Sequence, residues 1–181
     1  MGALEYLKHY TYDDYKLWEG SWELFEGFPV PMSPAPMINH QTIAYAIAMQ
    51  LGLQVEDCER CVALGEEDYK LADDTVLRPD VVLICDEPHD AYITKAPEII
   101  VEVISKSTAT NDETYKFKKY EEEHVLYYIL AYPDELRAKV YKLVDGKYLK
   151  AGDFSKEKYD FTETLCKVNI DFNKVFKRFR K

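Results

Sequence analysis

The segment of residues 97–108, with the sequence PEIIVEVISKST, constrains the fold more than any other part of the chain. Its five β-branched apolar residues surround one glutamate and leave no continuous polar face. Such a run is typical of a strand that is covered on both sides of its sheet. Since helices usually supply that cover, we expect an α/β or α+β domain in which helices flank a mixed central sheet.

Glu102 interrupts this apolar run, and burying an unpaired carboxylate costs several kcal/mol. Asp80 directly precedes another apolar run, VVLIC at 81–85, and consecutive strands are usually neighbours in a sheet. Two carboxylates held close together repel each other unless a cation shares them. Mg²⁺ or Mn²⁺ binds such pairs and keeps positions for a phosphate. The sequence therefore predicts a metal site at Asp80 and Glu102, and a core ion pair of Glu102 is the alternative.

The next helix is expected within residues 107–124, and it carries a cation. Asp112, Lys116 and Tyr120 are spaced four residues apart, which places them on one face of a helix. A lysine beside a metal-bound phosphate can neutralise the charge that develops during hydrolysis, or orient the attacking water. The alternative is a solvated helix whose charges pair only with one another.

The remaining segments have the lengths and turn residues of a single domain over residues 1–181, without an internal repeat or a long linker. The predicted elements are, in chain order, a helix at 11–20 capped by Thr11, a hairpin turning at Gly27, a loop at 34–37, a helix at 39–55 capped by Asn39, strands within 62–85, a strand at 126–133 and a hairpin turning at Asp145-Gly146.

The chain is strongly acidic, with a formal net charge of −10, so it repels nucleic acid at long range. Its one strongly basic run, KVFKRFRK, forms a basic C-terminal tail at about 174–181. On charge alone, a dedicated nucleic-acid binder is disfavoured. No apolar run is long enough to span a membrane, and no cationic start leads into an apolar segment. The expected compartment is therefore the cytoplasm, with no membrane partner.

The four cysteines do not complete a recognised metal or redox motif. Cys58 and Cys61 have CxxC spacing, whereas Cys85 and Cys166 stand alone. A structural zinc site usually needs two such pairs, or one pair with nearby histidines. A thioredoxin-like pair would start a helix, whereas this pair is expected near the end of the helix at 39–55. We therefore expect incidental or core cysteines, with a redox or metal pair as the alternative.

Several of these segments, in the same order, resemble the motifs of one family. RPDVVLI, PEIIVEVISKST and D-x-x-x-K-x-x-x-Y are similar to the core motifs of the Uma-two family of restriction endonucleases, within the PD-(D/E)XK nuclease superfamily. WELFEG and MSPAPMINHQTI extend the resemblance over about residues 12–149. The resemblance implies a restriction-endonuclease-like fold and a Mg²⁺- or Mn²⁺-dependent nuclease.

The resemblance also implies catalytic roles for matching residues. Asp80 and Glu102 match the metal-binding carboxylates, and the backbone carbonyl of Val103 would be a further metal ligand. The lysine that usually follows two residues after the second carboxylate is replaced by Ile104. Lys116, on the following helix, matches a catalytic lysine displaced to that position.

Supporting residues follow from the same resemblance. Glu23 matches an accessory glutamate of the metal site. His40 and Gln41 match a polar pair near the cleft, and Tyr120 matches the tyrosine of the helix. For His40, a surface or helix-cap role is the alternative. VLYYILAY at 125–132 departs from the V-P-E-Y-W-x-V-D of the family, so the contacts of that segment with substrate or a partner subunit are not carried over.

The resulting hypothesis is a metal-dependent endonuclease that hydrolyses phosphodiester bonds in DNA. The alternative is a non-catalytic binding or regulatory protein that retains the nuclease fold, which the acidic composition favours. A homodimer is compatible with the apolar segment LYYILAYP, although a buried core strand explains that segment equally well. A protein partner could supply the DNA affinity that an acidic chain lacks.

Overall fold

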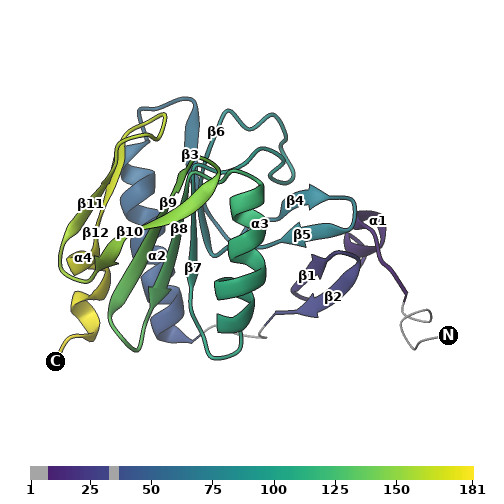
Figure 1. The fold of residues 1–181 in the computed structure, drawn as a ribbon, viewed down its shortest axis with the longest axis horizontal. Coiled ribbons are helices and arrows are strands. Elements are labelled where there is room, and N and C mark those ends of the chain that lie inside the picture. Colours follow the sequence, from purple (N-terminus) through teal and green to yellow (C-terminus); the bar gives the residue numbers. More distant parts are fainter. Residues whose placement is uncertain (1–7, 33–36) are drawn as a thin grey trace.

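A six-stranded mixed sheet forms the centre of the molecule, in a computed structural model that describes residues 8–32 and 37–181 (Figure 1). The strand order is β10-β9-β8-β7-β6-β3. Its strands are β3 (Cys61–Gly65), β6 (Val81–Cys85), β7 (Ile99–Val103), β8 (Tyr127–Tyr132), β9 (Arg137–Val144) and β10 (Lys147–Phe154). β7 and β8 are parallel, and all other neighbours in this sheet are antiparallel. The predicted mixed central sheet is confirmed.

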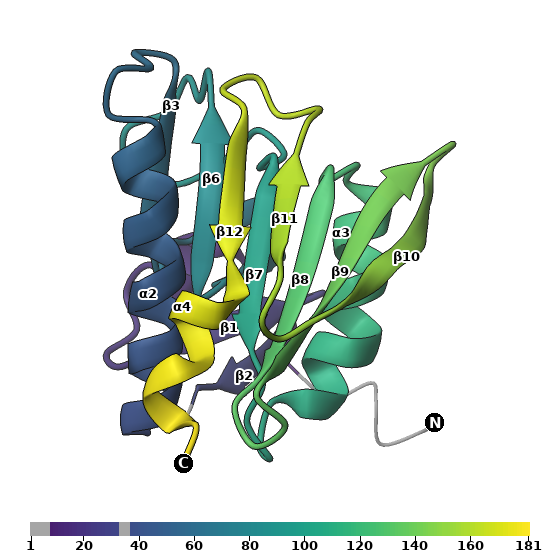
Figure 2. The ribbon, with the colours of Figure 1, turned by 90° about the vertical axis from the view of Figure 1, so that its left-hand side faces the viewer.

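Different elements cover the two faces of this sheet (Figures 1 and 2). One face carries α2 (Ile38–Gln54), the hairpin of β11 (Lys158–Phe161) and β12 (Val168–Asp171), and α4 (Phe172–Phe176). The other carries a π-helical segment (Asn111–Lys116), which continues into α3 (Phe117–Glu122), and a smaller sheet. All five residues of β7 are therefore buried, and the predicted doubly covered strand is confirmed. The helix predicted within 107–124 is confirmed as well.

The smaller sheet brings the N-terminal part of the chain to the face covered by α3. It consists of β1 (Trp22–Phe25), β2 (Phe28–Pro31), β4 (Tyr69–Ala72) and β5 (Thr75–Leu77), in the order β2-β1-β5-β4, and α1 (Tyr12–Tyr15) packs beside it. β1 and β2 form the predicted hairpin, and its turn residues Glu26 and Gly27 have φ angles of 49° and 83°. Positive φ at both central positions is typical of a tight hairpin turn. The hairpin predicted at Asp145-Gly146 is confirmed in the same way, with φ angles of 51° and 75°.

Two predicted helix boundaries are wrong. Thr11 does cap α1 through a capping box with Asp14, but the helix ends at Tyr15 rather than at Gly20. α2 begins at Ile38, because the extended backbone of Met37 occupies the N-cap position. Asn39 therefore lies in the first turn of α2, where its Oδ1 accepts a hydrogen bond from the N–H of His40 at 2.8 Å. Most of the loop predicted at 34–37 lies outside the described residues.

The C-terminal basic run is folded rather than a free tail. It spans most of α4 and the 3₁₀ turn Lys177–Phe179. Phe176 is fully buried, and the guanidinium of Arg180 donates hydrogen bonds to Ser155. The apolar side chains of this segment pack into the core, and Lys174, Lys177 and Arg178 are exposed.

The apolar segment LYYILAYP forms an interior strand. All six residues of β8 are buried between β7 and β9, so core packing explains this segment. A homodimer stays a prediction. None of the helices in the described part of the chain is both long and apolar enough to cross a membrane.

The four cysteines are paired across the fold and not within the CxxC motif. The structure joins Cys58 to Cys166 and Cys61 to Cys85. Cys58 and Cys61 lie shortly after the end of α2 at Gln54, as predicted. The prediction of core cysteines is confirmed for Cys61 and Cys85, which are buried, and Cys58 and Cys166 pack against the same core.

Candidate active site

Asp80 directly precedes β6, and Glu102 lies in the adjacent strand β7 of the central sheet. β6 and β7 pair with Val81 opposite Val101, and extending this antiparallel register by one residue places Asp80 opposite Glu102. Side chains of directly opposite residues point to the same side of a sheet. Both carboxylates line one cavity of about 720 Å³. The predicted adjacency of the two strands is confirmed.

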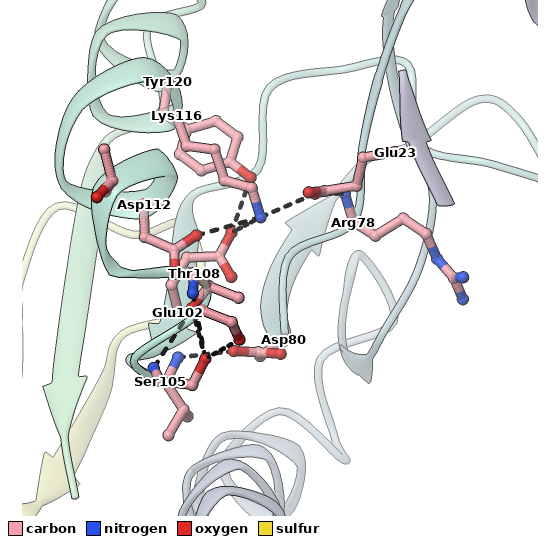
Figure 3. Close-up of polar contacts among 12 residues, drawn as sticks. Glu23, Arg78, Asp80, Glu102, Ser105, Thr108, Asp112, Lys116 and Tyr120 are labelled. Carbon is pink, nitrogen blue, oxygen red and sulfur yellow. Dashed lines mark hydrogen bonds and ion pairs between the residues drawn. The ribbon is translucent and has the colours of Figure 1, made fainter. Parts of the chain in front are cut away.

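Lys116 lies at the centre of a buried group of carboxylates (Figure 3). Its side chain is 4 % exposed, and its Nζ lies 2.8 Å from Glu23, 3.1 Å from Glu102 and 3.4 Å from Asp112. Glu23 lies in β1, so the smaller sheet contributes this carboxylate to the group around Lys116. Asp112 and Lys116 lie on the π-helical segment, and such local widening of a helix is frequent at functional sites.

Glu102 accepts both of its described hydrogen bonds on one oxygen. Its Oε1 lies 3.1 Å from Lys116 Nζ and 3.0 Å from the hydroxyl of Tyr120, as expected for residues on one helix face. Burial raises the pKa of Glu102 well above its usual value. The positive charge of Lys116 lowers that pKa in part, whereas the negative charges of Asp112, Asp80 and Glu23 raise it further. Burial alone would lower the pKa of Lys116, but the neighbouring carboxylates raise it well above its usual range. Lys116 is therefore held in its protonated form.

Asp80 is bound by a different pair of groups. Its Oδ2 accepts a hydrogen bond from the backbone N–H of Val103 at 2.7 Å and lies 3.2 Å from Nε2 of His40. His40 is placed there by the first turn of α2, and its buried Nδ1 has no hydrogen-bond partner in the described residues. Burial lowers the pKa of His40, but the hydrogen bond and the charge of Asp80 outweigh this and raise it overall.

We expect His40 to titrate above its usual pKa of about 6.5 in metal-free protein. Since the folded pKa is raised, protonated His40 contributes stability that is fully present below the unfolded pKa and is lost as pH rises through the folded pKa. A two-dimensional NMR titration of the imidazole protons measures this, with the signal assigned by its absence in His40→Gln. Asp80→Asn should lower the pKa, and a wild-type value at or below 6.5 would contradict the prediction.

The structure does not bring every predicted residue to this cavity. Gln41 is exposed on α2 and does not line it. Val103 contacts Asp80 through its N–H, and a ligand role for its carbonyl oxygen stays a prediction. Arg78, two residues before Asp80 in the sequence, directs its guanidinium away from the buried carboxylates (Figure 3), and its Nε lies 3.1 Å from Asp68.

Asp112 is the residue that the sequence analysis placed on the correct face but left out of the site. It is buried, and burial raises the pKa of its carboxyl group. Its four-residue spacing from Lys116 places both side chains on one helix face, where they can form an ion pair. The depth at which that pair is buried was not predictable from spacing.

The donor set fits a divalent cation. Among the acidic residues that line the cavity are Glu23, Asp80, Glu102 and Asp112, and Lys116 is the buried lysine of the same lining. Such an excess of carboxylates favours a bound cation with oxygen ligands. Within the described ranges, no three of these carboxylates lie within 4.8 Å of one another.

Comparisons with known proteins identify the family and the fold of the chain. A family model, Uma2, described as "Putative restriction endonuclease", matches residues 12–163. One solved structure, a crystal structure of "a putative nuclease belonging to DUF820" from Anabaena variabilis at 1.96 Å resolution, superposes with a TM-score of 0.73. The match covers 92 % of this chain and 97 % of that one, at 17 % identity, so it shows the shared fold alone. No curated protein matches the chain.

Proposed function

Because the chain belongs to the Uma2 family, we propose that it is a divalent-metal-dependent endonuclease that hydrolyses phosphodiester bonds in DNA. The observation that carries the proposal is the meeting of Asp80 and Glu102 on adjacent strands, beside the buried Lys116, in one cavity. These are the residue types that phosphoryl chemistry needs: carboxylates for a metal and a fixed positive charge near the phosphate.

Asp80 and Glu102 would hold Mg²⁺ or Mn²⁺, with the carbonyl of Val103 as a further ligand and Glu23 in support. A bound ion of this kind polarises the scissile phosphate and lowers the pKa of a coordinated water. Glu102 is the penultimate residue of the buried strand β7, and Lys116 and Tyr120 both contact one oxygen of its carboxylate. That fixed orientation reduces the reorganisation needed when the ion binds.

Lys116 supplies the protein's own charge stabilisation. Its raised pKa keeps it protonated throughout the neutral range, so it can offset negative charge that develops on the phosphate. Asp112 lies 3.4 Å from its Nζ and positions the ammonium from the same helical segment. His40, which holds Asp80 at 3.2 Å, would orient that carboxylate and release it as the cation approaches.

DNA binding is expected to be weak and sensitive to salt. The chain carries a net charge of −10, and the cavity lining offers only a few cations besides Lys116. One of these, Arg78, already lies 3.1 Å from Asp68. We propose that a protein partner or a second copy of the chain supplies additional affinity for DNA.

A cleavage assay tests this function directly. Supercoiled plasmid and single-stranded DNA, with RNA of matched sequence as a comparison, are incubated with the protein at low salt and with Mg²⁺ or Mn²⁺. We expect nicked and linear DNA products that depend on the metal and disappear with EDTA. Intact DNA at protein concentrations above that of the substrate would contradict the proposal.

The alternative is a non-catalytic binding or regulatory protein on the same fold. One observation favours it: Lys116 is already engaged by three carboxylates, and Asp80 by His40 and the N–H of Val103. A pull-down that recovers a stoichiometric protein partner, together with no cleavage and no metal binding by calorimetry, would support this alternative.

A further inference from the structure

The four cysteines meet at the end of the central sheet opposite the candidate active site. Asp80 precedes the first residue of β6, whereas Cys85 is its last residue and pairs with Cys61 at the start of β3. This end of β6 points upward in Figure 2. Cys58 lies in the turn after α2, and Cys166 lies between β11 and β12. Segments far apart in the sequence therefore bring the four cysteines to this end of the sheet.

The sulfur atoms are closer together than two separate disulfides require. The Sγ atoms of Cys58, Cys61 and Cys166 all lie within 4.8 Å of one another. Cys61 also belongs to a second group, with the Sγ of Cys85 and a carboxylate oxygen of Glu98, within the same limit. Two independent disulfides need only two bonded pairs, but here Cys61 connects the pairs into one cluster.

A tetrahedral thiolate site would account for this convergence. Zn²⁺ binds four cysteine sulfurs at about 2.3 Å, which separates the sulfurs by roughly 3.8 Å. The sulfur of Cys61 lies within 4.8 Å of each of the other three, whereas Cys85 does not share that limit with Cys58 and Cys166 together. Structural sites of this type commonly combine a C-x₂-C pair with two cysteines from another part of the chain. Cys58 and Cys61 have that spacing, on a turn closed by a hydrogen bond from the N–H of Cys61 to the carbonyl of Cys58 at 3.1 Å.

We propose that, in its reduced form, this cluster is a binding site for one Zn²⁺ ion, held by Cys58, Cys61, Cys85 and Cys166. A thiol or phosphine reductant gives two electrons to each disulfide, and with two protons each disulfide becomes two thiols. The four thiols release four protons as they bind Zn²⁺, so the loaded site has a charge of −2.

Charged groups of both signs lie near these cysteines. Arg60 lies between the two cysteines of the CxxC motif, and its Nε lies 2.9 Å from Asp86. The ammonium of Lys95 donates a hydrogen bond to the carbonyl of Cys85 at 3.1 Å. On the other side, Glu98 accepts a hydrogen bond from the N–H of Leu165 at 2.7 Å and so holds the segment that carries Cys166. The metal-loaded site would crosslink the turn after α2, the end of β6 and the β11–β12 loop. This proposal does not depend on nuclease activity.

The test uses the full chain reduced with a phosphine under anaerobic conditions. Thiols are counted after denaturation, and Zn²⁺ and Co²⁺ are then titrated into the folded reduced protein. We expect four thiols, one metal ion per chain, and the visible and near-ultraviolet absorption bands of Co²⁺ in a tetrahedral thiolate site. Oxidation with hydrogen peroxide should release the metal, as the four thiolates give back four electrons and re-form two disulfides.

Two variants serve as the matched comparison. Cys61→Ser removes the cysteine shared by both groups and should abolish stoichiometric binding, whereas Val62→Ser, at a 46 % exposed neighbour, should bind as the wild type does. Circular dichroism follows folding in each sample. Absence of stoichiometric Zn²⁺ binding overturns the proposal, whether the reduced chain stays folded or unfolds and is not refolded by Zn²⁺. Binding that survives in Cys61→Ser overturns it as well.

Discussion

Replacing Lys116 by methionine is expected to lower the free energy of unfolding by about 3–5 kcal/mol, because breaking a buried ion pair from one side leaves uncompensated buried charge. The ammonium is within 3.4 Å of three carboxylates, and its side chain is only 4 % exposed. Methionine retains the length of the side chain, so the loss measures charge more than volume. Urea denaturation, followed by circular dichroism, gives this free energy.

The pH dependence separates lost charge from lost packing. Without Lys116, the pKa of Glu102 should rise further above its already raised value, so the folded state binds more protons than the unfolded state. The stability deficit of Lys116→Met should therefore shrink as pH falls from 8 toward 5. Adding Glu102→Gln to this variant should also recover part of the loss, because it removes one of the unpaired charges.

Lys118→Met is the matched control for this variant. Lys118 lies two residues away with a side chain that is 75 % exposed, and its pair with Glu122 spans 3.6 Å. An exposed pair of this kind is worth at most about 1 kcal/mol. If the two variants lose the same free energy of unfolding, or if the loss in Lys116→Met does not change with pH, the prediction that Lys116 stabilises the fold by compensating buried charge is contradicted.

Asp80→Asn is expected to reduce metal-dependent DNA cleavage by at least about 100-fold while leaving the fold intact. Asparagine keeps a carbonyl oxygen to accept the hydrogen bond from the N–H of Val103, so the stability cost should be about 1 kcal/mol. What is lost is the negative charge that, with Glu102, would hold the cation. Initial rates on plasmid DNA and calorimetric Mn²⁺ titrations measure the two effects separately.

Asp134→Asn provides the comparison within the same cavity. Asp134 also lines the cavity but is exposed, and it lies on the loop after β8 rather than beside Glu102. This variant should cleave DNA and bind Mn²⁺ as the wild type does. Cleavage retained in Asp80→Asn would remove Asp80 from the catalytic site, and unchanged Mn²⁺ binding in Glu102→Ala would remove Glu102.

Several parts of the site were predictable because their signals are local. A β-branched run with a single carboxylate predicted that Glu102 would be buried, and it is 2 % exposed. The four-residue spacing of Lys116 and Tyr120 predicted that both would reach one place, and both contact Glu102. Helix ends were less predictable: Asn39 is a good capping residue, but the backbone of Met37 takes that position.

The sequence by itself determined the central sheet, the burial of Glu102 and its adjacency to Asp80. Apolar patterns indicate which residues are buried on folding. Strands that follow each other in the sequence pair at a low entropy cost of loop closure. Only the tertiary structure decided that the helix widens at 111–116, that Glu23 contacts Lys116, and that the cysteines form contacts across the fold. Those contacts join separate parts of the chain, as between Cys58 and Cys166, 108 residues apart. They form only when packing of the whole domain compensates the entropy of bringing such segments together, and no local pattern records that balance.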